Sequence, residues 1–110
     1  MIVKTEPDTL IGKRYDEKTY HCYDFIVECL DVPSLDDISV ATAESDINNN
    51  TPFYKEMDMP TNYCIIVLGK KHIGIFKDGY IYHNDRDCVK AESMRTMQRK
   101  YTKMRYYDVY

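Results

Sequence analysis

The sequence predicts a single α+β domain in which N-terminal helices pack on an antiparallel sheet. Apolar residues recur at helical spacing between Cys22 and Leu30, whereas short β-branched and aromatic runs bounded by turn residues fill much of the chain after Asn62. With 110 residues, of which 44% are hydrophobic, the chain has room for one core. We therefore expect one domain over residues 1–110.

Two helices are expected before the sheet. Pro7 and Asp8 are typical of a short helical turn that runs toward Lys13. The longer helix begins at Cys22, because apolar side chains follow at the i+3, i+4, i+7 and i+8 positions, and it ends before Pro33. Cys22 therefore lies in the first turn of this helix.

The second half of the chain is predicted to form strands. The Asp78-Gly79 pair indicates a two-residue hairpin turn, because both central residues of the matching turn need a positive φ. Residues 34–59 are acidic and weakly periodic, and we expect loops there with a short helix between Ser39 and Ile47. The predicted strands are 63–68, 72–76, 80–84 and 104–110, with a helix over 91–100.

The composition argues against several classes of function. A net charge of -3, from 15 basic and 18 acidic residues, disfavours nucleic-acid binding. No apolar stretch reaches the ~18 residues needed to cross a bilayer, so no membrane span is expected. The first residues lack a basic start and an apolar stretch, so we expect synthesis in the cytoplasm without a signal peptide. The four cysteines lack CxxC spacing, which favours free thiols and disfavours a zinc module.

The predicted hairpin turn sets the register of the two strands that it joins. It places Gly74 opposite His83, and His72 opposite Asp85. Side chains alternate across a strand, so His72 and His83 share a face and lie within reach of each other, with open space beside them at Gly74. That face carries His72, Gly74, Phe76, Ile81, His83 and Asp85, and the opposite face carries Ile73, Ile75, Tyr80 and Tyr82.

Cys22 completes a candidate catalytic group if the long helix packs on the face that carries the histidines. A thiol in the first turn of a helix experiences the positive end of the helix dipole, which lowers its pKa. His72 would then act as the base and His83 would orient its ring, with Asp85 as an alternative orienting residue.

Each of these residues also has a structural interpretation. A cysteine on an apolar helix face is usually a core residue, and Cys29 is expected to be one. The histidines are compatible with ordinary sheet positions, and Gly74 with a bulge or a close approach of backbone. His21 points away from Cys22 around the helix and is expected to be a surface or capping residue.

Three stretches resemble a known family. They are Leu10-Ile11-Gly12-Lys13-Arg14-Tyr15 with Tyr20-His21-Cys22-Tyr23-Asp24-Phe25-Ile26, then Lys71-His72-Ile73-Gly74-Ile75-Phe76, then Gly79-Tyr80-Ile81-Tyr82-His83. They resemble, in this order, the nucleophile helix, the strand of the base and the strand of the third catalytic residue in NlpC-type cell-wall endopeptidases. These enzymes are papain-like cysteine peptidases, and the chain looks most similar to their phage tail-associated members.

The resemblance implies a papain-like NlpC-type fold and a cysteine peptidase. Its substrate would be peptidoglycan stem peptides, typically cleaved between D-glutamate and a diamino acid through a thioester. The implied roles are Cys22 as nucleophile, His72 as general base and His83 as orienting residue. Tyr15 is implied beside the oxyanion, which the backbone N–H of Cys22 would also hold. No cofactor or metal is implied; phage tail proteins are the expected partners, and a virion the expected route to the wall.

Two other functions stay open from the sequence. The same shell suits a catalytically silent structural or binding component of a phage tail or effector, in which case Cys22 is unreactive. The same triad also suits an amidase or another acyl-transfer enzyme that acts on a host protein.

Overall fold

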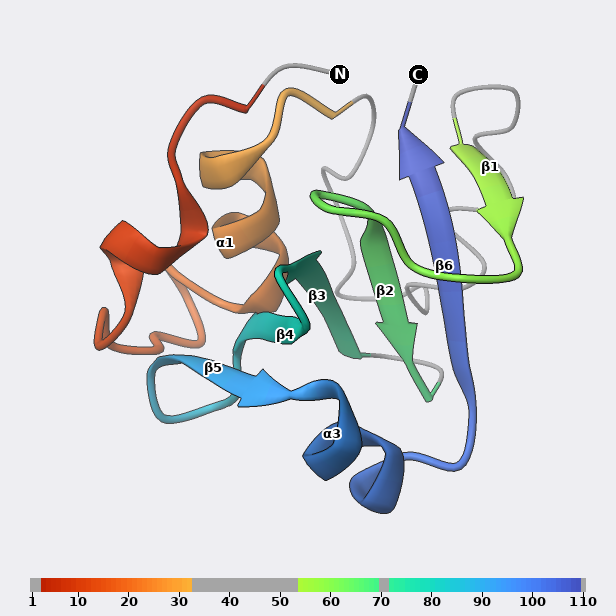
Figure 1. The fold of residues 1–110 in the computed structure, drawn as a ribbon. Coiled ribbons are helices and arrows are strands. Elements are labelled where there is room, and N and C mark those ends of the chain that lie inside the picture. Colours follow the sequence, from red (N-terminus) through yellow and green to blue (C-terminus); the bar gives the residue numbers. More distant parts are fainter. Residues whose placement is uncertain (1–2, 33–53, 70–71, 110) are drawn as a thin grey trace.

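Six antiparallel strands form one sheet in the computed structural model, which describes residues 3–32, 54–69 and 72–109 (Figure 1). Every neighbouring pair of strands runs antiparallel, in the order β1-β6-β2-β3-β4-β5. The strands are β1 (Tyr54–Met57), β2 (Ile65–Leu68), β3 (His72–Lys77), β4 (Tyr80–Asn84), β5 (Val89–Ser93) and β6 (Met104–Val109). The helices in these ranges are the 3-10 helix η1 (Pro7–Leu10), α1 (Cys22–Cys29) and α3 (Met94–Lys100).

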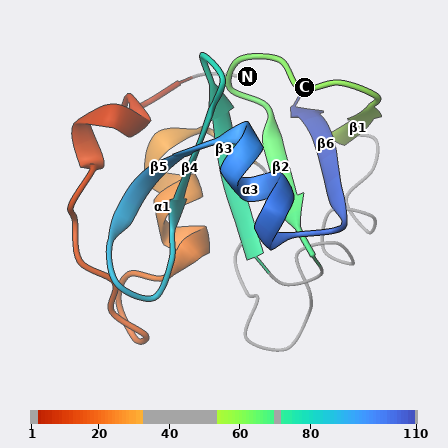
Figure 2. The ribbon, with the colours of Figure 1, turned by 60° about the horizontal axis from the view of Figure 1, so that its bottom comes forward.

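The expected α+β class is therefore confirmed, with the two α-helices on opposite faces of the sheet. Figure 2 shows α3 in front of β2 and β3, and α1 behind β3 and β4. Each helix covers a separate apolar cluster. The cluster under α1 includes Phe25, Ile26, Leu30, Ile65, Val67, Ile73 and Ile75. The cluster under α3 comprises Cys64, Ile66, Leu68, Ile81 and Met97, with Phe76, Met94 and Tyr101 among the residues packed against it.

Helix α1 begins at the residue that the apolar spacing indicates. His21 is its N-cap, since the His21 ring accepts a hydrogen bond from the Tyr23 N–H and the Asp24 carboxylate accepts one from the His21 N–H. This confirms the expected capping role of His21. The apolar side of the helix, with Ile26 and Cys29 fully buried, packs on the sheet.

The β3–β4 hairpin has the predicted register. Asp78 and Gly79 adopt positive φ values of 52° and 84°, as a tight two-residue turn requires. Ile75 pairs with Tyr82 and Lys77 with Tyr80, so successive side chains alternate between the two faces as expected.

Two predicted elements were wrong. Residues 91–93 do not begin a helix, because they continue β5 along β4 as far as Ser93, whose hydroxyl caps α3 by accepting from the Thr96 N–H. Residues 54–57, which were expected in a region of helix and loops, form β1 at the sheet edge against β6. The short helix expected between Ser39 and Ile47 lies outside the described residues. No helix in the described parts of the chain is long and apolar enough to span a membrane.

Candidate active site

His72 and His83 form a hydrogen-bonded pair on the α3 side of the sheet. His72 Nε2 lies 2.7 Å from His83 Nδ1, and the two rings meet nearly at right angles, with centroids 4.9 Å apart. The alternation of side chains in the β3–β4 hairpin brings them together, as the sequence predicted. His83 is almost fully buried at 2% exposure. The geometry therefore leaves Nδ1 of His72 as the ring nitrogen not engaged by His83.

Gly74 packs tightly beside this pair, and the expected open space is not there. A Cβ atom at Gly74 would lie 2.9 Å from both Ile81 Cγ2 and the Tyr82 carbonyl oxygen, and 3.3 Å from His83 Cβ. The side chains and backbone of β4 fill the position. Gly74 is thus needed for the close approach of β3 and β4 next to the histidines.

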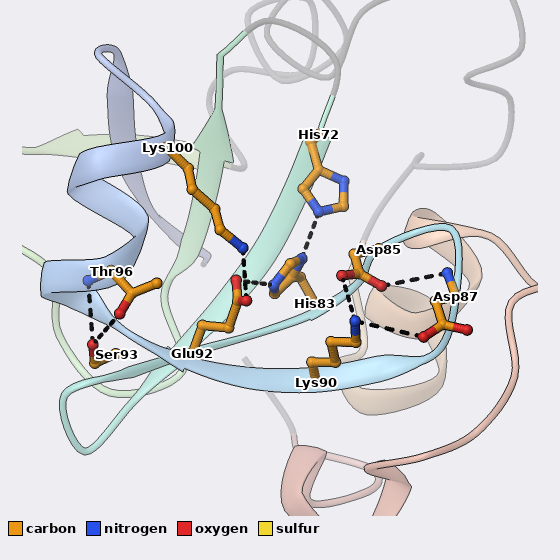
Figure 3. Close-up of polar contacts among 9 residues, drawn as sticks. All are labelled: His72, His83, Asp85, Asp87, Lys90, Glu92, Ser93, Thr96 and Lys100. Carbon is orange, nitrogen blue, oxygen red and sulfur yellow. Dashed lines mark hydrogen bonds and ion pairs between the residues drawn. The ribbon is translucent and has the colours of Figure 1, made fainter.

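A chain of polar contacts continues from His83 to the helix α3 (Figure 3). His83 Nε2 lies 3.1 Å from Glu92 Oε2, and Lys100 Nζ donates to Glu92 Oε1 over 2.8 Å. Glu92 stands on β5, and Lys100 is the last residue of α3. Four side chains from β3, β4, β5 and α3 thus form one row that ends at the His72 ring.

Both histidines are neutral near pH 7. Burial, followed by the neighbouring His83, lowers the pKa of His72 from 6.5 to about 4, although the Asp85 and Glu92 carboxylates oppose this shift. Burial also lowers the pKa of His83, against the raising effect of its hydrogen bond to Glu92. A neutral imidazole has one donor and one acceptor nitrogen, so the pair can pass a proton and can accept one.

Cys22 occupies the N-terminus of α1 on the opposite side of the sheet. The condition stated for the candidate catalytic group, that this helix packs on the face of the histidines, is not met, because α1 packs on the other face. The alternate face of β3, with Ile73 and Ile75, is apolar and buries the apolar side of α1 more favourably. A hydrogen bond with the backbone of Ile73 nevertheless lowers the pKa of the Cys22 thiol, so the sulfur lies beside the residue that follows His72 on β3.

The Cys22 thiol is protonated in the resting protein. Burial raises its pKa from 9.0 to about 11, and the backbone groups of Ile73, Cys22 and Tyr23 only partly offset this effect. The helix dipole was expected to lower the pKa, but burial outweighs the helix N-terminus here. Among the described residues, no hydrogen bond joins the thiol to His72 or His83, and all four cysteines are free.

Asn84 links this helix to the strand of His83. Its side-chain amide donates to the backbone carbonyl of Tyr20 over 3.1 Å, two residues before Cys22. Asn84 is 1% exposed, and it follows His83 on β4. Two consecutive residues of β4 therefore contact the two parts of the candidate site. His83 bonds to His72, and Asn84 bonds to the segment that leads into α1.

The other two predicted site residues lie nearby but engage different groups. Tyr15 is half-buried in a segment next to the β4–β5 loop, where its backbone N–H donates to the Asp87 carbonyl over 3.0 Å. Asp85, the alternative orienting residue, pairs with Lys90 at 3.2 Å. His83 and not Asp85 therefore contacts the His72 ring. In the described ranges no group of three or more His, Cys, Asp and Glu side chains could hold a metal ion.

Three residues around the histidine pair were not predicted from the sequence. Glu92 and Lys100 extend the row from His83, and the ring of Tyr101 stacks on His72 with centroids 6.3 Å apart. Glu92 was overlooked because residues 91–100 were assigned to a single helix, whereas Glu92 lies on β5. The N-cap preference of Ser93 is the signal that would have ended the strand and placed Glu92 on the face of His83.

The chain matches no protein-family model, no curated protein and no solved structure. The arrangement itself has a definite chemical capacity. It offers a thiol at a helix N-terminus, a neutral imidazole at the end of the adjacent strand, and a second imidazole and a carboxylate that hold the first. A nucleophile, a base and an orienting group are the components of acyl-transfer chemistry.

Proposed function

We propose that this protein is a cysteine peptidase that hydrolyses peptide bonds in peptidoglycan stem peptides. The observation that carries the proposal is the 2.7 Å hydrogen bond between His72 and His83, on the strand against which the helix of Cys22 packs. A base held by a second polar residue near a thiol is the arrangement that thiol peptidases use. The choice of peptidoglycan rests on the resemblance of the three sequence stretches to NlpC-type endopeptidases.

In the proposed reaction, the Cys22 sulfur attacks the carbonyl carbon of the scissile bond, and the thiol proton passes to Nδ1 of His72. The C–N bond then breaks, and the amine leaves with the proton that His72 returns. Water attacks the resulting thioester, giving one proton to His72 while the C–S bond breaks. His72 returns that proton to the Cys22 sulfur, and the acid product departs.

The pKa values place the proton on the Cys22 sulfur in the resting protein, so its transfer to His72 is coupled to attack on the substrate. With the pKa of Cys22 at about 11 and that of His72 at about 4, the proton stays on sulfur until a substrate is attacked. His72 accepts it during the attack, when the negative charge moves onto the substrate oxygen. The backbone N–H of Cys22 at the start of α1, with Tyr15, is proposed to stabilise that oxygen. Catalytic hydrogen bonds are often long without substrate and shorten when it binds.

The test is digestion of purified peptidoglycan and defined muropeptides, with new amine termini and fragment masses read by mass spectrometry. Cleavage between D-glutamate and the diamino acid is expected. Cys22→Ala should abolish it, and His72→Gln should reduce it by about 10²–10⁴-fold, the usual contribution of a general base. Cys88→Ala is the matched control, because Cys88 is also a half-buried free thiol but lies in the β4–β5 connection.

Two results would count against the proposal. Cleavage that survives in Cys22→Ala would assign it to a contaminant or to another residue. A folded protein that cleaves no stem peptide, and that forms no acyl adduct on Cys22 with an activated ester, would favour a structural role in a larger assembly. Adduct formation without wall cleavage would point to acyl transfer on a protein substrate instead.

A further inference from the structure

The hydrogen bonds that join His72, His83 and Glu92 have a fixed order of donors and acceptors. Both histidines are neutral, so each carries its single ring proton on one of two nitrogens. A carboxylate has no proton to donate, so His83 must carry its proton on Nε2 to satisfy Glu92 Oε2. His83 Nδ1 is then a bare acceptor. His72 must in turn carry its proton on Nε2, and its Nδ1 is left with a lone pair.

Lys100 keeps Glu92 ionised, and an ionised carboxylate can only accept a hydrogen bond from His83. Burial alone would raise the pKa of Glu92, but hydrogen bonds from Lys100 and His83 outweigh it, and the net pKa lies below the ordinary value. The Glu92 side chain is 18% exposed, whereas Lys100 is 50% exposed at the end of α3. A surface cation thus neutralises a carboxylate that faces the buried ring of His83.

We propose that Glu92, held by Lys100, is a positioning residue that sets the tautomers of His83 and His72, so that Nδ1 of His72 is the free base. This inference rests on the proposed function for its purpose, because that Nδ1 is the atom that would take the Cys22 proton. It concerns the ring protons themselves, however, and these can be observed without any substrate. Glu92 contacts no reacting atom in this scheme and acts only through the two rings.

Glu92→Gln tests this order of donors and acceptors with a side chain of the same shape. Lys100 can only donate, so the glutamine oxygen is expected to turn toward Lys100 and its amide group toward His83. His83 Nε2 must then accept, which moves the ring proton of His83 to Nδ1 and that of His72 to Nδ1 as well. The free base at Nδ1 of His72 is lost without a change of side-chain volume.

The measurement is the long-range ¹H–¹⁵N spectrum of histidine-labelled protein, in which protonated and bare ring nitrogens are resolved. In the native chain both His72 and His83 are expected to be protonated at Nε2, and in Glu92→Gln at Nδ1. The double variant Glu92→Gln with Lys100→Met frees the glutamine to turn back, so both rings are expected to regain the native tautomer. Asp85→Asn is the matched control, since Asp85 lies beside the same histidines but pairs with Lys90.

The catalytic consequence follows the tautomers. Glu92→Gln is expected to lower kcat for muropeptide cleavage by about 10²-fold or more with little change in KM, because it removes the base and leaves the binding surface. The double variant should recover most of this loss. A merely structural role for Glu92 would not predict recovery when a second contact is removed.

Each outcome bears on the inference separately from the proposed function. A native His83 or His72 protonated at Nδ1 overturns the inference, and this measurement requires no variant to fold. Unchanged tautomers in a folded Glu92→Gln also overturn it, even if the native protein cleaves peptidoglycan. Failure of the double variant to restore the native state overturns the role of Lys100. Native tautomers that respond as expected in a protein without hydrolase activity uphold the inference and reject the peptidase.

Discussion

The amide of Asn84 holds the Tyr20 carbonyl at 3.1 Å, and this contact ties the entry of α1 to the end of β4. Tyr20 precedes the capping residue of α1, and its backbone also exchanges hydrogen bonds of 2.8 Å with Asp16. The position of the N-terminus of α1 therefore depends on Asn84, the residue that follows His83 on β4. A rigid link of this kind keeps Cys22 and the histidine pair in a constant relation, which the proposed reaction requires.

Replacing Asn84 should weaken both the fold and the proposed reaction. Asn84→Ala removes a buried hydrogen bond and should lower the free energy of unfolding by about 1–3 kcal/mol. It should also reduce kcat by about tenfold or more, because small displacements of a reacting group are costly. Urea denaturation and muropeptide cleavage measure the two effects. Asn62→Ala, which removes hydrogen bonds at the exposed Asp78 turn, should leave kcat unchanged; an equal loss in both variants would contradict the positional role of Asn84.

Local signals account for the parts of the fold that the sequence predicted well. The Asp78-Gly79 turn sets the β3–β4 register within a few residues, so the meeting of His72 and His83 follows from the hairpin alone. The bounds of α1 likewise follow from apolar spacing and from a cap next to Cys22. These features need no knowledge of the rest of the chain.

Non-local pairing accounts for the rest. The edge strand β1 exists because β6, at the far end of the sequence, offers it a partner, and its own residues give a weak signal. Residues 91–93 are strand because β4 lies beside them, although their composition also suits a helix. The face chosen by α1, and with it the raised pKa of Cys22, depends on burial in the complete core.

Gly74 should tolerate no side chain. Gly74→Ala would push a methyl group against Ile81 and the Tyr82 carbonyl at 2.9 Å, so the free energy of unfolding should fall by about 1–3 kcal/mol. The strain also displaces His83, whose Cβ lies 3.3 Å from the new atom. Thermal unfolding and the ring signals of His83 would show the two effects. Gly79→Asn is the control, because that position has open space and a turn φ that asparagine accepts; equal stability of Gly74→Ala and the native protein would disprove the close packing.

Alkylation of Cys22 should report a thiol that is protonated at neutral pH. With a pKa of about 11, its rate with iodoacetamide should rise roughly tenfold for each pH unit from 7 to 10, because only the thiolate reacts. Peptide mass spectrometry measures the rate at each cysteine. Cys64 is the matched comparison, since its pKa is also raised to about 11 by burial but only 1% of it is exposed, so it should stay unlabelled in the folded protein. A rate that levels off below pH 7 would instead indicate a thiolate–imidazolium pair in the resting site.

Acid should destabilise the protein through the histidine pair. The pKa of His72 falls from 6.5 to about 4 on folding, so between these pH values the unfolded chain binds more protons than the folded one. The stabilisation by neutral His72 is therefore complete above pH 6.5 and is lost as the pH falls toward 4, by up to about 1.4 kcal/mol per pH unit. The lowered pKa of His83 acts in the same direction.

Urea unfolding between pH 7 and 4.5 measures this slope, and His72→Gln isolates the contribution of His72. The free energy of unfolding of the variant should decline less steeply with falling pH, because glutamine takes up no proton. The carboxylates that face the pair, Asp85 and Glu92, are present in both proteins. Both carboxyl pKa values are lowered, so these groups lose their stabilising charge mainly at the acid end of the range. Parallel declines for His72→Gln and the native chain would mean that His72 titrates alike in the folded and unfolded states, which would contradict the lowered pKa of the buried ring.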